Sequence, residues 1–373
     1  NHYYLSGGFL IQYEKKRILK LVEEGKITAS EALSLLEVLE EETKQNSEKE
    51  KEIVNDLSTV VILDEEEKKE QDMKKKVSSA KDMLFDLFDN VMTKVKDLDL
   101  NFTKSTDVTH IFQHAYEPVK QIEIEVANGH VETGAWEQND IKVECEAKVY
   151  RTDDTSAARQ TLLDEVTFSI KDEKLFFVVG QKWMRVNSKL YLPKMHFDKM
   201  KVRLFNGDIQ GDTLNIDQLK VKTANGKIIL NDLTSLKADL ETANGNIELT
   251  NINTVELECD TINGAIKSNG VFQEADFETF NGLISVEDCG EKIKLLKAKS
   301  ASGAIKIIVP QNVHATGEAK SYLGSLEVDL HGMKVVEEKN EVVQKLIKFT
   351  NELDAQTSIY AESKTAAVSI KHG

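Results

Sequence analysis

The chain has 373 residues, a formal net charge of −16 and a sequence pI near 5.1. This length allows two or three domains. An acidic chain repels nucleic acid and anionic lipid, so the composition argues against a nucleic-acid-binding protein. Hydrophobic residues make up 40% of the chain and aromatic residues only 6%, which predicts a core built from aliphatic side chains.

The cysteine content indicates a reducing compartment. The three cysteines, Cys145, Cys259 and Cys289, form no Cys-x-x-Cys motif, which argues against a disulfide framework and a zinc site. No apolar run approaches the roughly 20 residues that span a bilayer, and no signal-peptide pattern begins the sequence. We therefore expect a cytoplasmic chain with no transmembrane segment, and leave peripheral association with the envelope open.

Residues 12–40 predict a helical hairpin. Gly25 ends the first helix as a C-cap glycine, and Thr28 with Glu31 forms a capping box that starts the second. Two helices this short bury little surface alone, so we expect the hairpin to self-associate or to bind a protein partner. The apolar residues expected at that interface are Leu21, Leu33 and Leu36.

Two segments of different character follow the hairpin. Residues 41–78 are rich in Glu and Lys and predict a charged linker. Residues 79–105 contain a strongly amphipathic stretch that predicts a helix. Its polar face carries aspartates where membrane-surface helices carry lysine and arginine, so we expect this helix to cap the domain that follows.

From residue 201 onward the sequence repeats with a period of about 19 to 21 residues, which is typical of a solenoid. Threonine or serine stands two positions before each pair from Asn225-Gly226 onward, and isoleucine stands three positions after the asparagine or serine of every pair. The repeated pairs are Asn206-Gly207, Asn225-Gly226, Asn244-Gly245, Asn263-Gly264, Asn281-Gly282 and, with serine in place of asparagine, Ser302-Gly303.

This pattern predicts a mainly β fold, a single-stack parallel β-solenoid (β-helix) that occupies residues 110–373. Apolar and polar residues alternate on both sides of each pair, which indicates strand, turn and strand. In a parallel stack the asparagine amides can bond from coil to coil as a ladder. Asn-Gly also favours antiparallel hairpins, but a hairpin meander has no need to keep one residue type in register. We expect helical insertions near residues 153–166 and 336–353.

Two parts of the chain carry a resemblance to known bacterial proteins. Residues Arg17 to Leu36 are similar to the short bihelical SHOCT-like domain, and the Asn-Gly repeats resemble the β-strand-repeat family of candidate adhesins. The resemblance implies no catalytic residues. It implies a sensing or scaffolding role near the bacterial envelope, connected with envelope stress.

The residues themselves carry no recognisable catalytic, cofactor or metal motif. We therefore expect a protein that is not an enzyme, needs no cofactor or metal, and acts as an interaction scaffold. One alternative is a carbohydrate-binding or carbohydrate-active β-helix, which rests on analogy of fold alone. The other is a scaffold that polymerises end to end, as bactofilin-like β-helices do.

Overall fold

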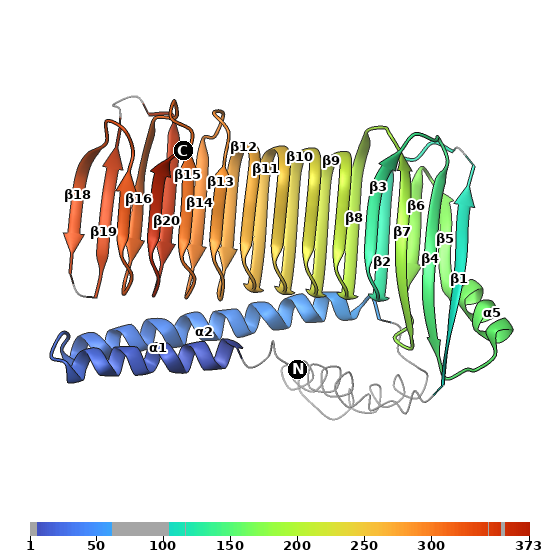
Figure 1. The fold of residues 1–373 in the computed structure, drawn as a ribbon, viewed down its shortest axis with the longest axis horizontal. Coiled ribbons are helices and arrows are strands. Elements are labelled where there is room, and N and C mark those ends of the chain that lie inside the picture. Colours follow the sequence, from blue (N-terminus) through green and yellow to red (C-terminus); the bar gives the residue numbers. More distant parts are fainter. Residues whose placement is uncertain (1–5, 62–103, 116, 342, 352–354) are drawn as a thin grey trace. The chain divides into compact units, whose positions relative to one another are not determined.

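The computed structural model describes residues 6–61, 104–115, 117–341, 343–351 and 355–373. These residues form a mainly β protein with N-terminal helices (Figure 1). The chain makes two compact units. Unit 1 contains residues 1–50, 213–219 and 227–373, and unit 2 contains residues 51–212 and 220–226.

The regular part of unit 1 consists of strands β10 (Ile228–Asn244), β11 (Ile247–Asn263) and β12 (Ile266–Thr279). Neighbouring strands run parallel, and Ile228 pairs with Ile247, which pairs with Ile266. The alternation seen in the sequence therefore turns the same side of each coil inward, and these three isoleucines are fully buried.

The later coils of unit 1 do not follow chain order. Their strands are β13 (Ile284–Asp288), β14 (Leu295–Ser300), β15 (Ile305–Val309), β16 (Ala315–Ser321), β17 (Leu326–Asp329), β20 (Thr357–Ser363) and β21 (Val368–His372). Strand β20 pairs in parallel with both β14 and β16, and β21 pairs with both β15 and β17. The last coil in the sequence is thus inserted between two earlier coils.

The helical insertion predicted near residues 336–353 is wrong. This stretch contains strands β18 (Lys334–Asn340) and β19 (Lys345–Thr350), which pair antiparallel. Strand β19 also pairs antiparallel with β16, so it is hydrogen-bonded on both edges. Apolar spacing that includes Leu346 and Ile347 suggested a helix, but Leu346 is buried in a strand within the sheet.

Unit 2 combines parallel and antiparallel pairs. Its strands are β1 (Ser105–His114), β2 (Gln121–Asn128), β3 (Val131–Trp136), β4 (Ile141–Tyr150), β5 (Val166–Lys171), β6 (Lys174–Val179), β7 (Met184–Pro193) and β8 (Phe197–Asn206), with parts of β9 (Ile209–Asn225). Strand β2 pairs in parallel with β6 and β8. Strand β4 pairs antiparallel with β1 on one edge and with β7 on the other. Helix α5 (Thr155–Glu165) lies where a helical insertion was expected.

The N-terminal helices are α1 (Ser6–Glu23) and α2 (Ala29–Ser58), which form a hairpin in Figure 1. The prediction that a linker starts at residue 41 is wrong, because α2 continues to Ser58. Its final turns bury Ile53, Val54 and Leu57, whose spacing fits one helix face. The capping helix expected at residues 79–105 falls, apart from its last two positions, outside the described residues.

Candidate functional site

The predicted corner asparagines of unit 1 form a ladder of side-chain hydrogen bonds. The Nδ2 of Asn263 donates to the Oδ1 of Asn244 at 2.9 Å, and the Nδ2 of Asn281 donates to the Oδ1 of Asn263 at 2.8 Å. The hydroxyl of Ser302 donates to the Oδ1 of Asn281 at 2.9 Å and continues the series. Each amide that both donates and accepts fixes the register of two neighbouring coils.

Unit 2 contains the same arrangement. The Nδ2 of Asn206 donates to the Oδ1 of Asn128, and the Nδ2 of Asn225 donates to the Oδ1 of Asn206, both at 2.9 Å. Asn128 and Asn206 belong to coils that are far apart in the sequence but adjacent in the sheet.

The corner glycines are required because the backbones of neighbouring coils approach closely. A Cβ built on Gly264 would lie 1.8 Å from the carbonyl oxygen of Gly245, and one on Gly282 would lie 1.8 Å from that of Gly264. At Gly303 the corresponding distance to Gly282 is 1.6 Å. Any side chain at these corners would force the coils apart, since real Cβ atoms do not approach oxygen so closely.

The threonine and serine column near the corners faces inward and is buried. The hydroxyl of Thr261 donates to the carbonyl oxygen of Gly245 at 2.9 Å, and that of Thr279 donates to the carbonyl oxygen of Gly264 at 2.9 Å. The column thereby satisfies corner carbonyls of the preceding coil.

A second corner column was missed by the sequence analysis. Thr213, Asp232 and Asn251 have φ values of 55°, 54° and 56°, and Gly270 continues the series one period later. The Nδ2 of Asn251 donates to the Oδ1 of Asp232. Asp and Asn tolerate the left-handed region and β-branched Thr rarely adopts it, so the 19-residue spacing of Asp232, Asn251 and Gly270 was the available signal.

Within unit 1, the hairpin packs through one side of each helix on the strand-bearing region, residues 227–373. The buried residues are Ile18, Ile27, Ala32, Leu35 and Leu39. Partly buried hydrophobic residues pack against them, and these include Leu21 and Leu36 of the hairpin and Tyr322, Leu323 and Val343 of the strand-bearing region. Leu33, the third predicted interaction residue, is 58% exposed and lies away from this core.

Arg17 of α1 anchors the hairpin to two adjacent coils, that of β16 and β17 and that of β20 and β21. Arg17 donates from Nη2 to the carbonyl oxygen of Leu323 at 3.1 Å and from Nη1 to that of Thr365 at 3.2 Å. Its Nη1 also lies 3.5 Å from the Oε2 of Glu14. A guanidinium presents several donors in a fixed plane, so one side chain can satisfy two corner carbonyls together.

Two charges on α2 form ion pairs with charges of opposite sign on unit 1. The Nζ of Lys49 lies 3.0 Å from the Oδ1 of Asp260 and 3.6 Å from Glu278. Glu42 lies 3.5 Å from the Nζ of Lys364 and 3.9 Å from that of Lys299. We call the six residues of unit 1 that receive these contacts the docking strip: Asp260, Glu278, Lys299, Leu323, Lys364 and Thr365.

Burial governs the protonation of Asp260 in the docking strip. It raises the pKa of Asp260 to about 6, although the neighbouring Lys49 ammonium acts in the opposite direction. Burial alone would lower the pKa of Lys49, but the carboxylates of Asp260, Glu278 and Glu241 together raise it. The ammonium therefore stays charged, while the carboxyl of Asp260 titrates within reach of mildly acidic pH.

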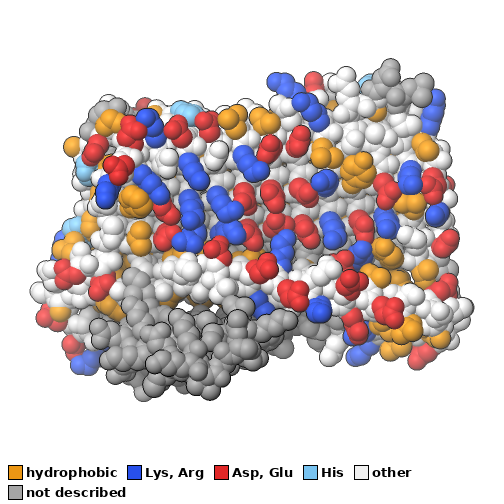
Figure 2. Space-filling view, turned by 180° about the vertical axis from the view of Figure 1, so that it is seen from behind, with side chains coloured by type: hydrophobic (Ala, Val, Ile, Leu, Met, Phe, Trp, Pro, Cys, Tyr) orange, Lys and Arg blue, Asp and Glu red, His pale blue; other side chains and the backbone are white. Residues whose placement is uncertain are grey.

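Within unit 2, α2 makes a further charged contact. Asp56 lies 3.6 Å from the Nη1 of Arg203 and 3.5 Å from the Nζ of Lys222. Arg203 also forms an ion pair with Glu125 on the adjacent strand β2. Figure 2 shows one face of the molecule covered by acidic and basic side chains, with hydrophobic side chains scattered among them.

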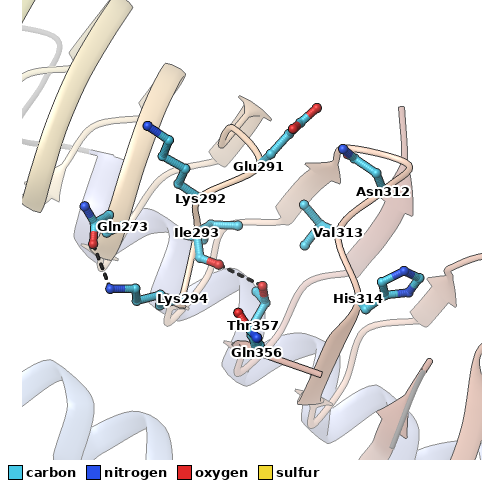
Figure 3. A pocket seen from close by; sticks show the side chains of 10 residues that line it. All are labelled: Gln273, Glu291, Lys292, Ile293, Lys294, Asn312, Val313, His314, Gln356 and Thr357. Carbon is cyan, nitrogen blue, oxygen red and sulfur yellow. Dashed lines mark hydrogen bonds between the residues drawn. The ribbon is translucent and has the colours of Figure 1, made fainter. Parts of the chain in front are cut away.

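The pocket in Figure 3 is an open hollow of about 580 Å³ on unit 1. Its walls include Glu291, Lys292, His314 and Gln356, and the Nζ of Lys294 donates across it to Gln273 at 2.9 Å. Its described lining contains no Phe, Tyr or Trp and a single carboxylate. It therefore lacks the aromatic platform and paired acids that would favour a carbohydrate site.

The cysteines do not provide a nucleophile. Cys145, Cys259 and Cys289 are all unpaired and buried. Burial raises the pKa of Cys145 and of Cys289 to about 12, and raises that of Cys259 strongly. A reactive cysteine needs an accessible thiolate, so these side chains act as small hydrophobic core residues.

Stacked strands with corner ladders and an N-terminal hairpin define a β-strand-repeat protein. The Toastrack model, DUF4097, matches residues 119–363, and a SHOCT-like domain model matches residues 14–44. The chain belongs to the Toastrack DUF4097 family and carries a SHOCT-like domain at its N-terminal side. These matches confirm the resemblance of residues Arg17 to Leu36 and of the Asn-Gly repeats to known bacterial families.

The chain is also similar to one curated protein and to several solved structures. The uncharacterized protein YvlB of Bacillus subtilis (strain 168) is 43% identical over 366 residues, which cover 97% of this chain and 99% of that protein. A candidate adhesin from Bacteroides fragilis is 12% identical with a TM-score of 0.36, and one from Parabacteroides distasonis is 14% identical with a TM-score of 0.39. Each structure covers 72% of this chain and is itself covered over 97%.

None of the helices in the described part of the chain has the length and apolar character needed to cross a bilayer.

Proposed function

We propose that this protein is a non-enzymatic interaction scaffold that recruits a protein partner, or another copy of itself, through its N-terminal hairpin. The observation that carries the proposal is the division of the hairpin into two sides. One side docks on unit 1, while Tyr13, Leu19 and Leu33 stay 60%, 54% and 58% exposed. Exposed apolar side chains mark a protein contact site where they gather in a patch, and this short hairpin offers three large ones for such a patch.

The stack beneath the hairpin suits a scaffold. Its corners are tied by asparagine amides and buried hydroxyls that are already engaged with one another. Polar groups that satisfy each other in this way make the stack a rigid support on which a partner can be held.

The setting is part of the same proposal. Three unpaired, buried cysteines support the cytoplasm as the compartment. The role near the envelope and in envelope stress rests on the family resemblance described for residues 17–36 and for the Asn-Gly repeats.

The test is a pair of charge substitutions on the exposed side of the hairpin. The variant Leu19→Glu with Leu33→Glu should lose partner capture by crosslinking in the native cell, or lose self-association measured as mass in solution. Lys20→Glu, which changes an exposed charge on the same helix, is the matched control. If the double variant retains both the mass and the crosslinked proteins of the parent chain, the proposal is wrong.

A specific observation favours the polymerising alternative as a second candidate. Strand β18 pairs with β19 on one edge, and its Val335 and Val336 are 48% and 68% exposed. An outer strand with exposed valines can pair with another chain. Electron microscopy of the parent chain and of Val336→Lys tests this: filaments in the parent that vanish in the variant support it, and an absence of filaments contradicts it.

A further inference from the structure

The last coil of unit 1 lies between two coils that precede it in the sequence. We call β20 and β21, with the corner between them, the inserted coil. Strand β20 pairs with β14 on one edge and with β16 on the other, and β21 pairs with β15 and β17 in the same way. In Figure 1, the dark red arrow of β20 stands between the orange arrows of β14 and β16. The flanking coils are therefore held apart by a segment that follows them both.

The two flanking coils share one register and can stack on each other directly. Ser300 of β14 and Ser321 of β16 both pair with Ser363, and β15 and β17 meet β21 with the same offset. Removal of the inserted coil would let β16 and β17 close onto β14 and β15 with every inward-facing side chain still inward. This contracted pairing joins coils connected by the short segment 310–314, whereas β20 reaches β14 only across residues 301–356. The more local pairing costs less loop entropy.

The charges of the flanking strands fit both arrangements. In the contracted one, Lys297 would lie opposite Glu318, since both pair with the same residue of β20. Lys299 would lie opposite Lys320, and like charges in that position are unfavourable. In the arrangement described here, Glu362 pairs with both of these lysines and separates them. Entry of the inserted coil therefore relieves a repulsion.

The hollow in Figure 3 lies where the inserted coil enters. Ile293 and Lys294 on one wall lead into β14, and Val313 and His314 on the opposite wall lead into β16. Thr357 of the inserted coil stands between these walls, and its hydroxyl donates to the carbonyl oxygen of Ile293 at 2.7 Å. The inserted coil holds the walls apart, and contraction would close the space between them.

The corner of the inserted coil is less complete than the corners with Asn-Gly. It carries Thr365-Ala366 instead. The Oγ1 of Thr365 is buried and has no hydrogen-bond partner among the described residues. The series of side-chain hydrogen bonds that reaches Ser302 therefore stops there. A buried hydroxyl left unpaired offsets part of the stabilisation that insertion brings, so the inserted coil is suited to leave.

The hairpin makes contacts that depend on the inserted coil. Arg17 donates to the carbonyl oxygens of Thr365 and Leu323, and so joins the inserted coil to the coil of β16. Glu42 lies 3.5 Å from the Nζ of Lys364, which directly follows β20. Lys364 and Thr365 would both leave the docking strip in the contracted arrangement, and the hairpin would lose these contacts.

We propose that unit 1 has two arrangements, the contracted one and the expanded one described here, and that entry of the inserted coil completes the docking strip and locks the hairpin. The contracted arrangement forms first, and insertion converts it to the expanded one. Insertion of a segment into an existing sheet is one of the ways in which proteins switch between states. The inference goes beyond the proposed function, because it concerns how the hairpin is held and not what its exposed side binds.

The first test traps the contracted arrangement with a disulfide. The variant Lys297→Cys with Glu318→Cys places its cysteines on adjacent strands when contracted, about 5 Å apart at Cα, and two strands apart when expanded, about 9.5 Å. A disulfide requires a Cα separation below about 7 Å. The full chain is refolded from urea in a glutathione redox buffer, which lets chance disulfides exchange. Peptide mass spectrometry then measures the disulfide between the two introduced cysteines.

Two control variants frame the result. Lys297→Cys with Lys320→Cys has nearly the same sequence spacing, but its positions are direct neighbours in neither arrangement. Lys297→Cys with Tyr360→Cys joins direct neighbours of the expanded arrangement and should trap that one. We expect the Glu318 variant to give at least about tenfold more disulfide than the Lys320 variant. Equal, low yields in these two variants would overturn the proposal.

The second test asks whether the inserted coil locks the hairpin. In hydrogen exchange, the amides of α2 around Glu42 should exchange at least about tenfold faster in the chain trapped through Glu318→Cys than in the chain trapped through Tyr360→Cys. Because coupling is reciprocal, Arg17→Ala with Glu42→Ala should raise the yield of the contracted disulfide. Lys16→Ala with Glu41→Ala, two exposed positions on the same helices, is the matched control and should leave the yield unchanged. Equal exchange in the two trapped chains would overturn the lock.

The exposed side of the hairpin is the same in all of these variants. Loss of partner capture in Leu19→Glu with Leu33→Glu is measured separately, so the two proposals can fail independently.

Discussion

Asn263 donates a side-chain hydrogen bond to Asn244, 19 residues earlier, and accepts one from Asn281, 18 residues later. One amide thus connects three coils. Its donor and its acceptor are both used along the stack, so a change at this position affects two interfaces at once.

Replacing Asn263 with alanine should lower the free energy of unfolding by about 2 kcal/mol, because two side-chain hydrogen bonds are lost beside a buried turn. Asn253→Ala, an exposed position in the same coil, is the control and should change stability by less than about 0.5 kcal/mol. Urea unfolding followed by circular dichroism measures both. Equal effects at the two positions would argue against the ladder.

Replacing Gly264 with alanine should destabilise the chain by about 4 kcal/mol or more, because the new Cβ would lie 1.8 Å from the carbonyl oxygen of Gly245. Gly134→Ala is the matched control: its Cβ would meet only the carbonyl oxygen of Asp212, at 3.7 Å. Thermal unfolding compares them. A Gly264 variant as stable as the Gly134 variant would show that the coils do not approach so closely.

The asparagine ladder and the corner glycines show how much of the fold the sequence could predict. The 19-residue recurrence of Asn-Gly predicted which residues lie over one another, since only stacking requires that register. It did not reveal why glycine is required at the corners: Gly264 and Gly282 allow the close approach of neighbouring backbones, and neither has a positive φ.

Other features could not be obtained from periodicity. The insertion of the last coil between β14 and β16 depends on long-range pairing, which no local pattern encodes. Residues 41–58 are rich in Glu and Lys, and this charge content suggested a linker. The helical spacing of Ile53, Val54 and Leu57 and the complementary positions of Glu42 and Lys49 become meaningful only once α2 is placed on its strip.

Stability should depend on pH through Asp260. Its pKa is about 6 in the folded chain and near the ordinary 3.8 when unfolded, so the folded state binds the extra proton between these values. The free energy of unfolding therefore gains a contribution as pH falls from 7 to 5, by about 1 to 2 kcal/mol. Asp260→Asn should remove that gain.

The measurement is urea unfolding of the parent and the Asn variant at pH 7 and pH 5. The difference between the two pH dependences isolates Asp260, because Glu14 and Asp276, whose pKa values burial also raises, are present in both chains. Parallel pH dependences in the two chains would contradict the buried position of Asp260.

The three cysteines should resist modification in the native chain at pH 8, because they are buried and their pKa values are raised. A thiol-reactive chromogenic disulfide should report three thiols only after a denaturant is added. Rapid labelling of any one of them without denaturant would contradict its place in the core.

The register of the coils can be measured through a disulfide, since the native thiols are protected. Lys237 pairs with Glu256 on the adjacent parallel strand, and Glu256 pairs with Glu274 one coil further. The variant Lys237→Cys with Glu256→Cys should form a disulfide under mild oxidation, because neighbouring strands bring the Cα atoms to about 5 Å. Lys237→Cys with Glu274→Cys, two coils apart, should not. A disulfide in the second variant and none in the first would contradict the stacking of coils in register.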